Sequence, residues 1–133
     1  MKKYLAIAVL LIATAGTAMA NSPTGIWQLH RSKTNGIDHL NVQFGACGNA
    51  VCARIIEAIG VNGRPVASYP HVGKTIIRNM VHQGGGKYAG GTIWDPRRDK
   101  TFALEMQVRG GRIRAEACAN AVLCRSFRWS RIR

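Results

Sequence analysis

The four cysteines are the residues best equipped for chemistry in this sequence of 133 residues. Cys47 and Cys52 enclose four residues, and Cys118 and Cys124 enclose five. Thiolates at such intervals match the usual spacing of a zinc site only loosely. A short hairpin loop instead brings its flanking residues to disulfide distance. We therefore favour the disulfides Cys47–Cys52 and Cys118–Cys124, while a rival pairing that ties the two hairpins together stays open.

Side chains that carry acid–base or nucleophilic chemistry form no local motif. No two histidines share the i, i+2 or i, i+4 spacing of a metal pair, and no serine lies in a Gly-x-Ser-x-Gly setting. The Gly73-Lys74-Thr75 segment has Ser68 where a phosphate-binding loop needs glycine. Cysteines held in disulfides are not nucleophiles. We therefore predict no catalytic residue, no metal and no cofactor, and a protein that is not an enzyme.

Residues 1–20 have the three parts of a secretory signal peptide. Two lysines precede an apolar run over residues 4–16, and an Ala-x-Ala cleavage site ends at Ala20. The run is shorter than the ~20 residues of a bilayer-spanning helix. We expect cleavage between Ala20 and Asn21, a periplasmic or secreted protein without a membrane span, and one domain over residues 21–133. Export to an oxidising compartment favours disulfides over zinc.

Alternation of apolar and polar residues indicates eight short strands. Turn formers such as Asn35-Gly36 and Gly110-Gly111 separate them. The candidate strands are residues 24–30, 38–46, 51–58, 73–82, 87–94, 100–108, 111–118 and 122–131. Short antiparallel strands at even spacing predict an all-β fold and a single up-and-down β-barrel. Such a barrel is either filled by side chains or holds one small ligand.

Five separated motifs follow one another along the chain. They are Gly25-Ile26-Trp27, Cys47-Gly48 with Cys52-Ala53-Arg54, Gly90-Gly91-Thr92-Ile93-Trp94-Asp95-Pro96, Lys100-Thr101-Phe102, and Cys118 with Leu123-Cys124-Arg125 and Trp129-Ser130-Arg131. Their order resembles the DUF2147 family of small exported bacterial proteins over nearly the whole predicted mature chain. The resemblance implies a lipocalin-like barrel and brings no established activity. One departure is Asp99, where the family more often has glycine before the lysine, which leaves the geometry of that turn open.

The Gly25-x-Trp27 motif also resembles the lipocalin signature. In that superfamily an arginine of the last strand lies across the tryptophan near the closed end of the barrel. The resemblance implies Arg131 as this partner, with Arg128 or Arg133 as alternatives. A guanidinium stacked on an indole stabilises by ~0.5–2 kcal/mol. We expect this pair to hold the barrel shut rather than to bind a ligand.

The predicted function is non-catalytic binding of a small, partly apolar ligand in the barrel mouth, which is a site that this architecture offers. Trp94, Phe102, Leu104 and Met106 are candidate lining residues, and the alternative is that they fill the core.

Positive charge suggests a second function, since 19 Lys and Arg face six Asp and Glu. Such an excess attracts polyanions. The charges are scattered along the sequence without the stripe of interleaved aromatics that a nucleic-acid module needs, which argues against nucleic acid. The alternative partner is an anionic envelope component, such as a glycan, lipopolysaccharide or a lipid head group. The oligomeric state stays open.

Overall fold

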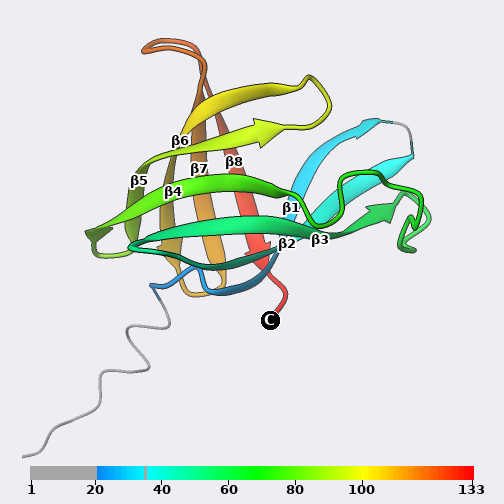
Figure 1. Cartoon of the computed structure of the whole chain (residues 1–133), viewed down its shortest axis with the longest axis horizontal. Coiled ribbons are helices and arrows are strands. Elements are labelled where there is room, and N and C mark those ends of the chain that lie inside the picture. Colours follow the sequence, from blue (N-terminus) through cyan, green and yellow to red (C-terminus); the bar gives the residue numbers. More distant parts are fainter. Residues whose placement is uncertain (1–20, 35) are drawn as a thin grey trace, which may run out of the picture.

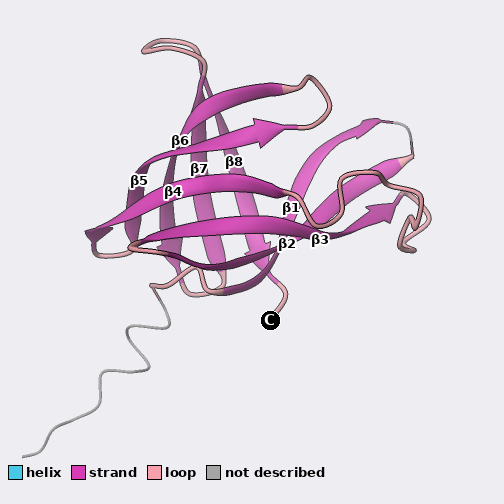
Figure 2. Cartoon of the chain, in the orientation of Figure 1, coloured by secondary structure: helices cyan, strands magenta, loops and turns pink. Residues whose placement is uncertain are grey.

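The computed structural model describes residues 21–34 and 36–133, and only the backbone of residues 30–34. The predicted signal peptide lies outside these residues. Eight antiparallel strands close into one barrel in chain order, joined by loops (Figures 1 and 2). The strands are β1 (Gly25–Thr34), β2 (Ile37–Cys47), β3 (Ala50–Gly60), β4 (Thr75–Gly84), β5 (Lys87–Asp95), β6 (Lys100–Arg109), β7 (Arg112–Cys118) and β8 (Cys124–Arg131). The predicted all-β, up-and-down barrel is confirmed.

Each predicted strand overlaps one observed strand, and the differences lie at the ends. β1 continues to Thr34 because its pairing with β2 extends to Thr34 and Ile37 at the turn. β8 begins only at Cys124 because the preceding residues 119–123 form a turn. The two-glycine turn predicted between β6 and β7 is present, with Arg109 paired to Arg112 and a positive φ of 57° at Gly110.

One end of the barrel is filled by large side chains. At this closed end the chain begins β1, and the β6–β7 turn lies beside it (Figure 1). The Trp27 and Phe44 rings meet edge to face with centroids 6.4 Å apart. Fully or almost fully buried residues near this end include Trp27, Phe44, Met106, Val108 and Ile113. The alternation along β7, with Ile113, Ala115 and Ala117 buried between exposed residues, shows how the pleat directs apolar side chains inward.

Strands β1 and β8 close the barrel along a short seam. Their register contains two residue pairs, Trp27 with Arg131 and Gln28 with Ser130. At the closed end, two further backbone hydrogen bonds continue this seam. The Ile26 N–H donates to the Arg133 carbonyl, and the Ile132 N–H donates to the Ile26 carbonyl. Toward the other, open end, the described strands are not paired with each other.

Candidate functional site at the barrel mouth

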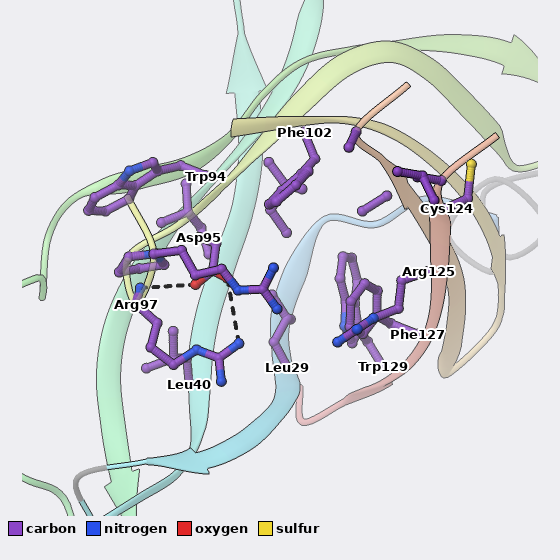
Figure 3. A pocket seen from close by; sticks show the side chains of 17 residues that line it. Leu29, Leu40, Trp94, Asp95, Arg97, Phe102, Cys124, Arg125, Phe127 and Trp129 are labelled. Atoms are coloured by element: carbon purple, nitrogen blue, oxygen red, sulfur yellow. Dashed lines mark hydrogen bonds and ion pairs between the residues drawn. The ribbon is translucent and has the colours of Figure 1, made fainter. Parts of the chain in front are cut away.

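A cavity of about 430 Å³ occupies the open end of the barrel (Figure 3). This volume lies within the ~300–1,000 Å³ of typical small-molecule pockets. Most of its apolar lining consists of large side chains from six strands and the β7–β8 turn, namely Leu29, Leu40, Ile76, Ile93, Phe102, Leu123, Phe127 and Trp129. The barrel is therefore filled at one end and hollow at the other.

The four candidate lining residues divide between the cavity and the core. Phe102 and Trp94 border the cavity. Leu104 and Met106 are buried in the core and are not part of the lining. The reason is the direction of β6, which begins at the open end and runs to the closed end, so that successive inward side chains lie deeper. Leu104 and Met106 therefore fill the core, which is the alternative that the sequence left open.

Trp94 is fixed at the rim by the β5–β6 turn. Its indole Nε1 donates a hydrogen bond to Asp99 Oδ1 at 2.8 Å, and its ring meets His71 edge to face at 5.2 Å. Asp99 has a positive φ of 53°, a conformation that glycine adopts without strain and that aspartate tolerates better than most residues. The turn thus keeps the backbone geometry that a glycine would allow, and the carboxylate gains a role in holding Trp94.

Four charged residues surround the cavity entrance, three arginines and one aspartate. Guanidinium nitrogens of Arg97 and Arg98 each lie 3.6 Å from Asp95 Oδ2. The Arg97 backbone N–H also donates to Asp95 Oδ1 at 2.9 Å. Figure 3 shows Asp95 and Arg97 on one side of the cavity and Arg125 on the other. Within residues 21–34 and 36–133, no carboxylate forms an ion pair with Arg125. We call Arg97, Arg98 and Arg125 the arginine rim.

Sequence reasoning missed the position of Arg125, although a signal for it exists. Arg125, Phe127 and Trp129 alternate along β8 and therefore share one face. Both aromatic residues line the cavity, and Arg125 is at the mouth end of the same series. An arginine at the same two-residue spacing as two inward-facing aromatic residues thus indicates a positive charge beside a cavity.

The described lining holds few groups that can take part in acid–base or nucleophilic chemistry. General acid–base catalysis requires a titratable group positioned on the reacting atom. The described lining has one carboxylate, Asp95, which lies between two guanidinium groups, and its cysteine, Cys124, is in a disulfide. Burial raises the pKa of the Tyr88 phenol, but this residue belongs to the core. Cys118 and Cys124 lie near Glu116, but their sulfurs are bonded to each other. They therefore offer no thiolate to a zinc ion.

Comparison with known proteins identifies the family of this chain. The model of a family described as uncharacterized proteins conserved in bacteria (DUF2147) matches residues 25–131. The chain belongs to the DUF2147 family. Among solved structures it is similar to protein HP1028 from Helicobacter pylori, described as a lipocalin-family protein, with a TM-score of 0.68 and 14% identity over 84% of each chain. At this identity the likeness shows the fold, which is lipocalin-like. A search of curated proteins finds no match.

The closed end of this DUF2147 barrel carries Trp27 and Arg131, the pair that the resemblance to the lipocalin signature implies. The Arg131 guanidinium carbon lies 4.5 Å from the centroid of the Trp27 ring. Its nitrogens donate to the Thr24 carbonyl at 2.6 Å, the Ser22 carbonyl at 2.8 Å and the Gly110 carbonyl at 3.3 Å. We call this arrangement of Trp27 and Arg131 the clasp. It joins the segment before β1, the β6–β7 turn and β8.

Both cysteine pairs of the DUF2147 chain form disulfides, Cys47–Cys52 and Cys118–Cys124. These are the local pairs that the spacing favoured. Disulfides persist in oxidising compartments, so the pairs in a bacterial protein indicate a location outside the cytoplasm. In the part of the chain that the structure describes, no helix has the length and apolar character needed to cross a bilayer.

Proposed function

We propose that this protein binds a small amphipathic molecule in the barrel mouth and does not convert it chemically. The observation that carries this proposal is the apolar cavity of about 430 Å³ at the open end. Burial of a ligand's apolar part there contributes ~0.8 kcal/mol for each methylene group removed from water. The cavity therefore supplies affinity for a chain or ring of modest size.

The arginine rim supports an acidic group on this ligand. Three arginines and one aspartate leave an excess of two positive charges at the entrance. Asp95 partly neutralises Arg97 and Arg98, whereas Arg125 forms no ion pair with a carboxylate of the described residues. A guanidinium presents paired N–H donors that fit a carboxylate or phosphate. We therefore place the apolar part of the ligand in the cavity and its acidic group at Arg125.

A series of compounds that share a ten-carbon chain tests this proposal. We expect decanoate to raise the thermal unfolding midpoint most, decanol less and decyltrimethylammonium least. At a hundredfold excess over Kd, a ligand stabilises the folded state by ~2.7 kcal/mol, which calorimetry resolves easily. We expect Arg125→Gln to weaken decanoate binding about tenfold, the lower end of what a charged hydrogen bond contributes, and to leave decanol binding unchanged. Titration calorimetry measures both affinities.

Arg114→Gln is the matched control, because it removes the same charge from an exposed position on the outer face of β7. It should leave decanoate binding unchanged. Failure of all three compounds to bind would overturn the proposed function. Equal loss of decanoate affinity in Arg114→Gln and Arg125→Gln would show a general charge effect and would contradict the role of Arg125.

A second candidate function, binding of an anionic envelope polymer, is favoured by the outer face of the barrel. Four exposed arginines, which looked scattered in the sequence, lie on the three adjacent strands β6, β7 and β8. The register places Arg109 directly opposite Arg112 and Arg114 directly opposite Arg128. Like charges at opposed positions destabilise a sheet. Within the described chain no carboxylate forms an ion pair with any of the four, so a polyanion would relieve their repulsion.

Salt-dependent binding to heparin tests this second function. We expect the wild-type protein to lose affinity steeply as salt rises, because bound polyanion releases its counterions. The double variant Arg114→Gln/Arg128→Gln should reduce the slope of log Kd against log salt by roughly two, one for each lost contact. Fluorescence titration at several salt concentrations measures this slope. A slope that these substitutions leave unchanged argues against the outer face as the binding surface.

A further inference from the structure

The connections at the open end hold apolar side chains in solvent. Val122 is 82% exposed and Leu123 is 63% exposed in the β7–β8 turn. Val61 and Val72, 61% and 47% exposed, lie in the β3–β4 connection at the same end. Four of the six large hydrophobic residues that are exposed in the described chain therefore belong to open-end connections. Val122 and Leu123 are adjacent and the most exposed of these, so the β7–β8 turn is the candidate interaction surface.

The β7–β8 turn is a fixed support for its two apolar residues. The Cys118–Cys124 disulfide closes it, and the Ala119 N–H donates to the Leu123 carbonyl at 2.9 Å. Asn120 Oδ1 accepts hydrogen bonds from the backbone N–H groups of Val122 and Leu123 at 2.9 and 3.0 Å. Because the turn is already ordered, insertion of Val122 into an apolar environment loses little conformational entropy. We call residues 119–123 the apolar tip.

The open end of the barrel has an excess of positive charge, and the apolar tip has no charged residue of its own. Among the described residues, the open end carries six Lys and Arg and three acids within two residues of its connections. The cations are Arg64, Lys74, Arg97, Arg98, Lys100 and Arg125, and the acids are Asp38, Asp95 and Asp99. A cation near an anionic bilayer surface increases partitioning by about fivefold. Charge and exposed apolar groups thus occur at the same end of the barrel.

We propose that the open end docks on an anionic lipid bilayer. Val122 and Leu123 enter the boundary between head groups and acyl chains, and the arginine rim lies at the level of the lipid phosphates. Apolar insertion combined with basic residues is how proteins bind the surface of an anionic membrane without spanning it. In this orientation the cavity entrance faces the bilayer. Docking itself requires no ligand in the cavity, so it goes beyond the proposed function.

Vesicle flotation with the purified protein tests the docking. We expect the protein to float with vesicles of equimolar dioleoylphosphatidylcholine and dioleoylphosphatidylglycerol, and not with vesicles of dioleoylphosphatidylcholine alone. Val122→Ser/Leu123→Ser should reduce binding to the anionic vesicles at least tenfold, because the apolar tip then has no large apolar side chain to insert. Since Leu123 also lines the cavity, the single variant Val122→Ser separates docking from ligand binding. It should lose about fivefold.

Val81→Ser is the matched control, because Val81 is 45% exposed on β4 and lies away from the open-end connections. It should bind as the wild type does. An unchanged thermal unfolding midpoint establishes that each variant is folded.

Two results would overturn the docking proposal. One is the absence of binding to either kind of vesicle. The other is full binding by Val122→Ser/Leu123→Ser together with loss of binding in Arg114→Gln/Arg128→Gln, which would assign the membrane contact to the outer face. The decanoate titration is read in solution without vesicles, so failure of the ligand proposal and failure of docking are distinguishable.

Discussion

Replacing Gly91 by alanine is expected to destabilise the barrel by at least ~3 kcal/mol, at the upper end of what overpacking costs. A Cβ atom at Gly91 would overlap the Arg78 carbonyl oxygen and the Met80 sulfur across the β4–β5 pairing. The backbone oxygen cannot move without disturbing β4, whereas a flexible side chain alone could yield. Total stabilities are typically ~5–15 kcal/mol, so this substitution removes a large part. Urea unfolding of wild type and variant measures the loss.

The neighbouring glycine provides the control for this prediction. Gly90 has a positive φ of 84°, and a Cβ there would meet nothing within 4 Å. Gly90→Ala should therefore cost only the strain of a left-handed residue, ~1–2 kcal/mol. If Gly90→Ala proves as harmful as Gly91→Ala, backbone strain rather than steric overlap governs this part of β5, and the close approach of β4 and β5 is not the reason for glycine at position 91.

Arg131→Ala is expected to destabilise the protein by ~1–3 kcal/mol through the loss of the stack on Trp27 and of hydrogen bonds to backbone carbonyls. The carbonyls belong to Ser22, Thr24 and Gly110, so the substitution releases three segments from one another. The unfolding midpoint in urea is the measurement. Arg131→Lys keeps the charge and should recover only part of the stability, because an ammonium lacks the planar fork that reaches several carbonyls.

Arg128→Ala is the matched control for the clasp. Arg128 is on the same strand and is exposed on the outer face opposite Arg114. Its removal should leave stability unchanged or raise it slightly, because it relieves repulsion between like charges. An equal loss in Arg128→Ala and Arg131→Ala would show that the clasp contributes nothing specific.

The strands could be predicted from the sequence because the pleat imposes a period of two on burial. In β7, exposed Arg112 and Arg114 alternate with buried Ile113 and Ala115, and this pattern appears directly in the residue types. The ends of strands were less predictable. Position 34 joins β1 because of pairing with β2, and pairing depends on a partner strand rather than on the residue itself.

The candidate site was harder to predict because it depends on depth and register. Phe102, Leu104 and Met106 have the same apolar character and the same spacing, yet only Phe102 reaches the cavity. The opposition of Arg114 and Arg128 likewise follows from the β7–β8 register, which residue types alone do not specify. Resemblance to lipocalins supplied the clasp, which spacing within the sequence could not.

The short β1–β8 seam leaves the barrel with a partial sheet edge. Beyond Ser130, toward the open end, the β1-facing side of β8 has backbone groups that are free of the β1 ladder. Exposed edges of this kind are templates for pairing with a second chain, and charged side chains along them discourage such pairing. Arg125 and Arg128 occupy this stretch of β8 in exposed positions. Repulsion between two copies at these arginines would therefore oppose edge-to-edge pairing along this stretch of β8.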